Sequence, residues 1–169
     1  MWYVIQIETG TETTVQKLIS GIVPTDFYED LRIIRYESKR RYAGAWHMEK
    51  KNMFPGYLFL ITDHIEDVFF ALKRVPRLTK LLRPDQKMTP LAKEEAEVLD
   101  RLSGGKGLVK MSFGIKEGDQ IKVTKGCLMG MESRIVKIDR HKRKAIIEIE
   151  LFGEKRKAEV GLEILLSVQ

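Results

Sequence analysis

The first hundred residues alternate between the periods of strands and helices. Residues 2–7 are rich in β-branched and aromatic side chains and predict a strand. The apolar residues that follow have the spacing of one helix face: Val15, Leu18, Ile19 and Ile22. Pro24 predicts the end of this helix, because it has no amide hydrogen to continue the hydrogen-bond ladder.

Two more strands are predicted at residues 31–36 and 56–62, separated by a polar stretch over 37–52. A second helix, closed by Pro76, is predicted from the apolar stripe of Ile65, Val68, Phe69, Leu72 and Val75. Residues 78–83 are compatible with another strand.

A third helix is predicted to start at Thr89-Pro90, since proline is tolerated in the first turn of a helix. One face of this helix would carry Leu91, Glu95, Val98, Leu99 and Leu102. The resulting order is β-α-β-β-α-β-α, which predicts an α+β sandwich of about 100 residues.

The pattern changes after residue 103. Residues 104–117 are rich in glycine and polar side chains, which predicts a flexible linker. From residue 118 onward, apolar and polar residues alternate with a period of two, as in 121–124 and 147–151. Several short strands within about fifty residues predict a small β-barrel. We therefore expect two domains, residues 1–103 and 118–169.

The composition narrows the class of protein. Thirty Lys and Arg against 24 Asp and Glu give a net charge of +6, which favours polyanionic partners, although many proteins of such charge bind no nucleic acid. No apolar run approaches the ~20 residues of a membrane span, and the chain begins directly with a strand. Cys127 is the only cysteine, so no intrachain disulfide can form. These features predict a cytoplasmic protein with no membrane partner.

Three segments, in this order, resemble proteins of the NusG family. The first is Trp2-Tyr3-Val4, followed by Thr9-Gly10. The second is Phe54-Pro55-Gly56-Tyr57-Leu58-Phe59, with Val75-Pro76-Arg77 after it. The third runs from Gly118-Asp119 through Gly126 and residues 137–139 to Leu151-Phe152-Gly153, and it resembles the motif of the SH3-like barrels called KOW domains. The resemblance implies a NusG-type N-terminal α/β sandwich tethered to a C-terminal KOW β-barrel.

The resemblance also implies a function. A NusG-type N-terminal domain is expected to dock on the clamp helices of RNA polymerase through an aromatic surface and to suppress pausing, with the factor acting as a monomer. Trp2, Phe54 and Tyr57 match that surface. Trp2 and Phe54 have an alternative interpretation as core residues, whereas the neighbouring Pro-Gly turn favours exposure of Phe54 and Tyr57.

A second polymerase contact is expected at the start of the second helix. His64, Glu66 and Asp67 fall where the family places a loop that meets the opposite side of the polymerase cleft. The alternative is an ordinary helix N-terminus, with Asp63 as its cap.

Within the family, the chain most resembles the specialised antiterminators called LoaP, on the strength of Arg41-Tyr42, Trp46-His47 and the basic turn described next. This likeness implies processive antitermination that is specific to one operon. The sequence also departs from the housekeeping pattern. Leu128 stands where a housekeeping barrel has an exposed Phe expected to meet a ribosomal protein or a termination factor, and Ser133 replaces a motif glycine.

Residues 137–144, the basic turn, hold five basic side chains and one acid between two predicted strands. We expect them to bind the backbone of an RNA hairpin in a leader transcript, since no aromatic residues interleave for base stacking. The predicted RNA-binding residues are Lys125, Arg134, Arg140, His141, Lys142, Arg143, Lys144, Lys155 and Arg156. A solvated turn is the alternative. The basic residues between Lys39 and Lys51 are candidates for contacts with upstream DNA or polymerase, with a solvated loop as the alternative.

Catalytic signatures are absent from the sequence. There is no phosphate-binding glycine loop or Gly-x-Ser-x-Gly elbow, and His47, His64 and His141 lack the spacing of metal ligands. Cys127 is expected to be a small buried hydrophobe rather than a thiolate. We therefore expect no enzyme, catalytic residue, metal or cofactor. Two other functions remain open: a housekeeping NusG-type factor that recruits proteins, and a KOW-containing ribosome-associated RNA-binding protein.

Overall fold

The computed structural model describes residues 1–74 and 88–165. The chain forms two compact units, Met1–Ile34 with Phe54–Ala96 and Arg35–Met53 with Glu97–Gln169. Each unit is built around its own β-sheets. The α+β class and the β-rich C-terminal part expected from the sequence are confirmed.

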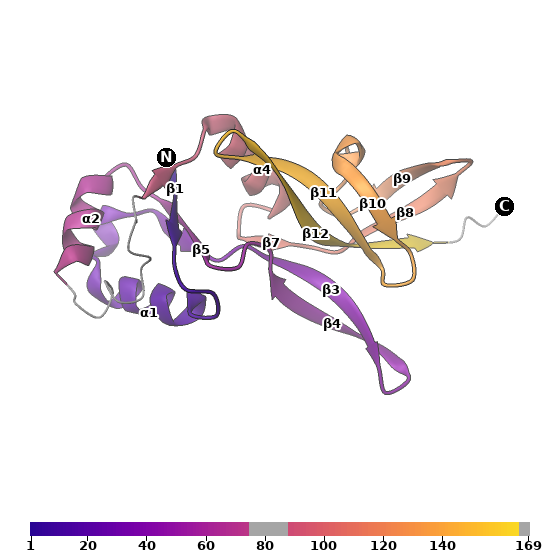
Figure 1. The fold of residues 1–169 in the computed structure, drawn as a ribbon, viewed down its shortest axis with the longest axis horizontal. Helices are drawn as coiled ribbons and strands as arrows, with labels where there is room; N and C mark the ends of the chain where they lie inside the picture. Colours follow the sequence, from indigo (N-terminus) through magenta and orange to yellow (C-terminus); the bar gives the residue numbers. More distant parts are fainter. Residues whose placement is uncertain (75–87, 166–169) are drawn as a thin grey trace. The chain divides into compact units, whose positions relative to one another are not determined.

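The first unit is a four-stranded antiparallel sheet in the order β2-β5-β1-β6. Its central strands β1 and β5 are labelled in Figure 1. Its strands are β1 (Trp2–Gln6), β2 (Asp30–Arg32), β5 (Tyr57–Ile61) and β6 (Thr89–Pro90). The long pairing joins β1 to β5, with Trp2 opposite Ile61 and Gln6 opposite Tyr57. Because side chains alternate along a strand, this register sends one set of residues to each face of the sheet.

Two helices, α1 (Glu12–Ile22) and α2 (Ile65–Lys73), cover one face of this sheet, with the short 3-10 turn η1 (Thr25–Phe27) between α1 and β2. The core under the helices is fully apolar, and its central members are Ile5, Ile7, Leu58, Leu60, Val15, Ile19, Val68 and Leu72. The opposite face carries Val4 and Phe59, both buried. The helical stripe predicted at residues 15–22 is thus explained, and α1 ends before Pro24 as expected.

A buried carboxylate links two of the sequence motifs in this unit. Glu12, which is 3% exposed, accepts hydrogen bonds from the Gly10 amide at 3.0 Å and from the Gly56 amide at 2.7 Å. Gly56 has a φ of +83°, and a Cβ there would lie 2.9 Å from the Ile7 carbonyl oxygen. The Thr-Gly and Phe-Pro-Gly segments are therefore the two sides of one tight junction.

The second unit contains the five-stranded sheet β10-β11-β12-β8-β9 and the three-stranded sheet β4-β3-β7. The strands of the larger sheet are β8 (Ser112–Glu117), β9 (Gln120–Lys125), β10 (Ile135–Asp139), β11 (Lys144–Leu151) and β12 (Glu154–Leu165), with η2 (Glu132–Arg134) before β10. The smaller sheet has β3 (Arg35–Tyr42), β4 (Ala45–Asn52) and β7 (Leu108–Val109). The helix α4 (Lys93–Leu102) enters this unit at Glu97.

Strands β3 and β4 form a long hairpin where the sequence predicted only a polar stretch (Figure 1). Its two-residue turn places Ala43 and Gly44 at φ of 52° and 76°, the conformation that matches the twist of paired strands. Most of these residues are charged or polar, so apolar and polar positions do not alternate in the way that predicts a strand. Tertiary packing supplies the missing driving force, since Tyr36 and Ser38 on β3 are buried.

Several predicted boundaries differ from the structure. Residues 112–117, expected in the linker, form β8, because they pair with β9 and run parallel to the end of β12. Thr89 and Pro90 form β6 rather than the start of a helix, and α4 begins at Lys93. The strand predicted at 31–36 is split between β2 and β3. The strand predicted at 78–83, together with Val75 and Pro76, lies outside the described residues.

Candidate functional site

An aromatic cluster occupies the face of the first unit that the helices leave uncovered. Trp2, Phe54 and Tyr57 surround Phe59, with ring centroids 6.2, 5.6 and 6.4 Å from that of Phe59. All three contacts are edge-to-face, which is a favourable arrangement for aromatic pairs. Phe54 also stacks on Tyr57 at 6.2 Å. The sequence segments at residues 2 and 54–59 are therefore brought together in space.

The exposure within this cluster differs from the prediction for Phe54. Phe54 is only 8% exposed, because its ring is held between Tyr57 and Phe59. Trp2 and Tyr57 are half-buried and form the accessible part of the cluster. The guanidinium of Arg32, which also pairs with Asp30, lies over the Trp2 ring at 5.3 Å from its centroid.

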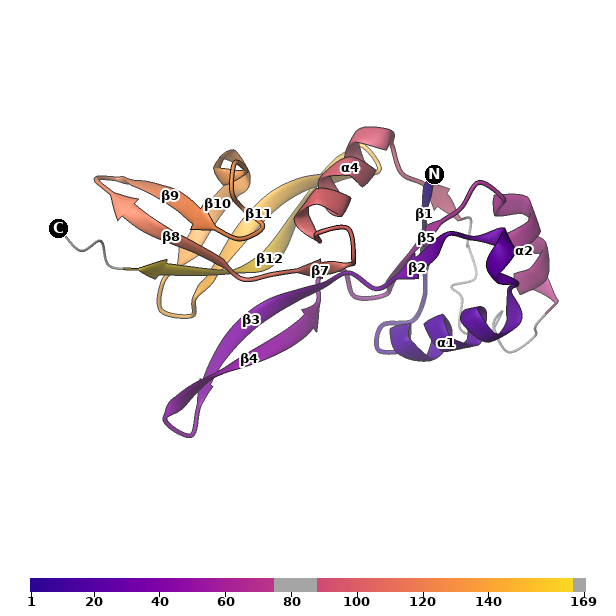
Figure 2. The ribbon, with the colours of Figure 1, turned by 180° about the vertical axis from the view of Figure 1, so that it is seen from behind.

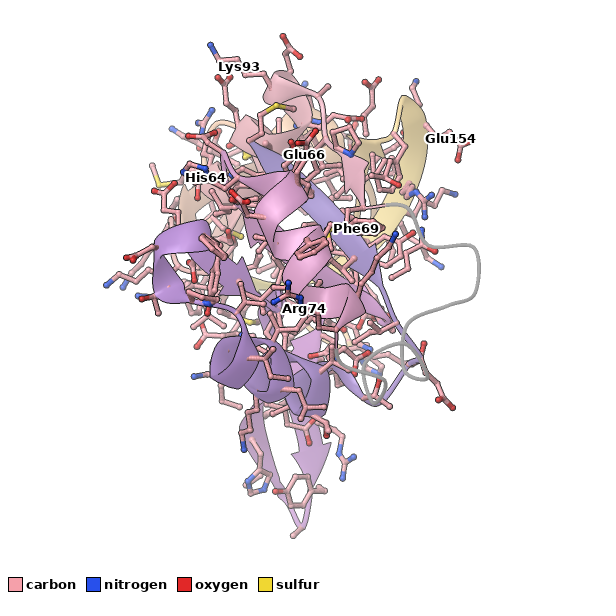
Figure 3. The ribbon with its side chains drawn as sticks, turned by 90° about the vertical axis from the view of Figure 1, so that its left-hand side faces the viewer. His64, Glu66, Phe69, Arg74, Lys93 and Glu154 are labelled. Atoms are coloured by element: carbon pink, nitrogen blue, oxygen red, sulfur yellow. The ribbon has the colours of Figure 1, made fainter. Side chains whose placement is uncertain are left out.

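The other predicted polymerase residues lie at the beginning of α2 and are exposed: His64, Glu66 and Asp67. Figure 3 labels His64 and Glu66. The N-cap is His64 rather than Asp63, and its amide donates to the Thr62 hydroxyl at 2.8 Å. Asp63 instead pairs with the N-terminal amine at 3.2 Å. The acidic side chains Glu66 and Asp67 in the first turn complement the helix dipole.

The outer side of α2 carries two exposed aromatic rings that the sequence reading missed. Phe69 was expected on the buried stripe, but it is 39% exposed, and Phe70 is 60% exposed. Lys73 lies 4.4 Å from the Phe69 ring and Arg74 lies 4.5 Å from the Phe70 ring, so each ring has a cation over it. Phe69 and Arg74 are labelled in Figure 3. The sequence signal was present as the spacing i, i+4 between each ring and its cation.

In the second unit, the basic turn lies between β10 and β11. Arg140, His141 and Lys142 are exposed at its tip. The Asp139 carboxylate accepts a hydrogen bond from the Lys142 amide at 3.0 Å, and this bond lowers the pKa of Asp139. The single acid of the segment therefore shapes the turn that presents the three basic residues.

Arg143 and Lys144 have partners within the protein. Arg143 pairs with Glu163 at 3.2 Å, and its guanidinium lies 4.0 Å from the ring centroid of Trp46 on the β3–β4 hairpin. Lys144 pairs with Glu159 at 3.1 Å. These two residues thus pack against the hairpin and β12, whereas the prediction placed them free in the turn.

The other predicted RNA-binding residues do not all gather at one end of the barrel. Arg134 and Lys155 line a separate depression of about 230 Å³, together with Ser133, Glu148 and Glu150. Lys125 is exposed at the end of β9. Arg156 lies over the Phe152 ring at 5.7 Å and 3.8 Å from Glu154.

A basic cavity of about 450 Å³ lies between the β3–β4 hairpin and the basic turn. The hairpin supplies Ser38, Lys39, Arg40, Arg41, Trp46 and Lys51, and the turn supplies His141, Lys142 and Lys144. Figure 2 shows the hairpin and the β10–β11 turn on the same side of the five-stranded sheet. The cavity thus joins two basic segments that are about a hundred residues apart in the sequence.

The base of the hairpin is held against β12 by a partly buried hydrogen bond. The Tyr36 hydroxyl donates to the Glu159 carboxylate. Burial, and then this bond to an anion, raise the pKa of Tyr36 far above its ordinary value. Burial raises the pKa of Glu159, but the hydrogen bonds from Tyr36 and Lys144 outweigh it and leave that pKa lowered. Further along β3, Lys39 pairs with Glu163 of β12 at 2.7 Å.

Leu128 and Cys127 are packing residues. Leu128 is fully buried, and its amide donates to the Ser112 hydroxyl at 3.1 Å, so it does not occupy the exposed position expected from the motif. Burial raises the pKa of the Cys127 thiol, which lies 3.4 Å from the same hydroxyl. In the described part of the chain, no three His, Cys, Asp or Glu side chains are grouped as a metal site would require. None of the described helices has the length and hydropathy of a membrane span.

Comparison with known proteins finds a family model for the N-terminal part and similar proteins over most of the chain. A family model described as "Transcription termination factor nusG" matches residues 1–100. The transcription termination/antitermination protein NusG of Streptococcus pyogenes serotype M1 is 29% identical over 169 residues, covering 95% of this chain and 92% of that protein. The corresponding protein of Helicobacter pylori (strain ATCC 700392 / 26695) is 22% identical over 174 residues, covering 94% and 93%.

A solved structure, titled "Domain interaction in Thermotoga maritima NusG", is similar to this chain with a TM-score of 0.54. The two sequences are 20% identical, and the match covers 96% of this chain and 92% of that one. The likeness concerns the fold.

Proposed function

This chain belongs to the NusG family of transcription factors, and we propose that it binds RNA polymerase through the aromatic cluster and acts there as a termination/antitermination factor. Its relatives carry the name transcription termination/antitermination protein. The family consists of transcription factors rather than enzymes. The site of action is the cytoplasm, where RNA polymerase works.

The observation that carries this proposal is the convergence of Trp2, Phe54 and Tyr57 on Phe59. A half-exposed aromatic surface backed by a rigid sheet loses little conformational entropy on binding, and aromatic residues often dominate protein interfaces. The clamp helices of the polymerase are the proposed partner. The exposed residues His64, Glu66 and Asp67 at the start of α2 provide a second, polar contact with the polymerase.

We further propose that the protein is an operon-specific antiterminator of the LoaP type, whose KOW barrel binds a leader RNA hairpin through the basic turn. The exposed residues Arg140, His141 and Lys142 support this assignment. Leu128 does not support the LoaP assignment. Its side chain is fully buried and so does not replace an exposed ring that would meet a protein partner. A housekeeping NusG-type factor would not need to prefer one leader RNA over others.

The polymerase proposal is tested with Trp2→Ala and Tyr57→Ala, the two half-exposed members of the cluster. Each should lower co-elution with RNA polymerase, whereas Phe70→Ala, an exposed aromatic of the same unit outside the cluster, should not. Circular dichroism establishes that each variant is folded. Unchanged co-elution of both cluster variants would exclude this surface.

The antitermination proposal is tested by transcription in vitro through a terminator, with and without an RNA hairpin in the leader. Read-through that requires both the protein and the hairpin is the expected result. Read-through that is independent of the leader would favour a housekeeping factor.

A further inference from the structure

The basic cavity combines the β3–β4 hairpin with the basic turn, and the function proposed for the turn does not account for the hairpin. Six of the nine lining residues are Lys or Arg, and no described residue that lines it is acidic. Such a concentration of one charge around a concave surface raises the local concentration of anions.

The acids nearest to the cavity leave part of its charge uncompensated. Glu163 pairs with Lys39 and Arg143, and Glu159 pairs with Lys144. Lys51 also lies near Glu159, whose pKa its charge helps to lower. Arg41 is in none of these pairs and is exposed at the hairpin end of the cavity. The cavity therefore presents fixed positive charge from two elements that are already held together by the pairs beneath it.

The size and walls of the cavity favour one class of anion. Its volume of about 450 Å³ exceeds what a single phosphate needs and falls within the ~300–1,000 Å³ typical of ligand sites. One wall is the Trp46 ring, whose position is set by the guanidinium of Arg143 at 4.0 Å. A nucleotide has the matching chemistry, with phosphates for the cations and a sugar and base for the apolar wall.

We propose that this cavity holds an unpaired nucleotide from the loop of an RNA hairpin, gripped by its phosphates between the β3–β4 hairpin and the basic turn. The inference rests on the RNA binding proposed above and adds the hairpin as half of the site. An unpaired loop nucleotide can turn outward into a cavity, whereas a base-paired one is held in the stack.

The experiment measures binding of the full-length protein to a labelled RNA stem-loop across a salt series, beside a blunt RNA duplex and a DNA duplex of equal length. Arg41→Ala tests the hairpin wall of the cavity. Arg140→Ala tests the basic turn at a position that does not line the cavity. Lys50→Ala is the matched control, since Lys50 is an exposed cation on β4 that lines no part of the cavity.

Arg41→Ala should weaken stem-loop binding roughly fivefold at 0.1 M salt, because each phosphate contact with an unpaired strand contributes about 0.7 to the slope of log affinity against log salt between 0.1 M and 1 M. Its effect on either duplex should be smaller, and Lys50→Ala should bind the stem-loop like wild type. Arg140→Ala should weaken binding of the stem-loop as well.

The remaining outcomes separate the two proposals. If Arg140→Ala weakens stem-loop binding but Arg41→Ala binds the stem-loop like Lys50→Ala, the cavity is excluded as a nucleotide site. RNA binding by the basic turn is then still supported. If neither variant differs from wild type, or wild type does not bind the stem-loop, both proposals fail. If Arg41→Ala weakens duplex DNA as much as the stem-loop, the cavity is a general nucleic-acid backbone site and the assignment to an RNA loop is wrong.

Discussion

Single residues in this protein are constrained most strongly where backbone groups meet buried side chains. Glu12 shows this, because its carboxylate accepts hydrogen bonds from the amides of Gly10 and Gly56 at a buried position. Removing this acceptor leaves the buried Gly56 amide without its partner, which costs more than the net value of the bond itself.

We therefore expect Glu12→Ala to destabilise the first unit by roughly 2–3 kcal/mol. Glu12→Gln keeps one carbonyl acceptor and should cost less. Urea denaturation gives the free energies, and hydrogen exchange should show loss of protection at the Gly10 and Gly56 amides. An alanine variant as stable as the glutamine variant would show that these bonds do not stabilise the junction.

A second prediction for a single residue concerns Gly161 on β12, where there is no room for a side chain. A Cβ at this position would lie 2.5 Å from the Glu37 carbonyl oxygen on β3 and 2.2 Å from the Met111 sulfur. Gly161→Ala should therefore push the hairpin away from the barrel and cost about 1–3 kcal/mol. Gly21→Ala is the matched control, since a Cβ there meets nothing within 4 Å and the residue lies in α1.

The control should stabilise the protein by up to about 1 kcal/mol, because alanine is the better helix former. Thermal unfolding of the two variants measures both effects. Equal melting temperatures for the two variants would contradict the close approach of β3 and β12.

At the scale of elements, the β3–β4 hairpin depends on contacts with β12 that change with pH. The pKa of Glu159 is held below its ordinary 4.5, so its stabilising effect is complete above pH 4.5 and is lost as the pH falls through the lower folded-state value. The pKa of Tyr36 is raised above its ordinary 10.0, so its effect is complete below pH 10 and is lost as the pH rises through the folded-state value.

Tyr36→Phe should remove the alkaline part of this dependence and reduce the acidic part. The measurement is the free energy of unfolding against pH for wild type and the variant, because the difference between the curves cancels the other titrating groups. Parallel curves from acid to alkaline pH would show that the Tyr36–Glu159 bond does not couple the hairpin to the barrel.

For the whole molecule, the proposed polymerase and RNA surfaces belong to different compact units, with the aromatic cluster in one and the basic cavity in the other. Substitutions in the two surfaces share no partner, so their effects on the two binding reactions should be independent.

Tyr57→Ala should therefore lower polymerase binding and leave stem-loop affinity unchanged, while Lys142→Ala should do the reverse. Both affinities are measured with each purified variant. A loss of both activities in a folded Tyr57→Ala protein would contradict the assignment of the two surfaces to separate units.

The sequence predicted those parts of the fold that depend on local pattern. The helical spacing of Val15 and Ile19 places both in the core of the first unit, and the alternation at 147–151 becomes β11, with Ile147 and Ile149 buried. The C-terminal part is built of strands, as the alternation of its apolar and polar residues predicted. These patterns predict the buried residues correctly because the side of a helix or strand that a residue faces depends only on its position along that element.

The environment of the candidate site residues was decided by tertiary structure. The Pro-Gly turn beside Phe54 predicted exposure, but the ring packs on Phe59 from another strand and is buried. Arg143 and Lys144 belong to a basic run in the sequence, yet Glu163 and Glu159 on β12 pair with them. The hairpin is held by Tyr36 and Glu159, which are 123 residues apart. The identity and order of residues determined the elements and the family, whereas contacts between distant segments decided which charges and rings remain free to bind, because burial and ion pairing depend on neighbours that no local pattern specifies.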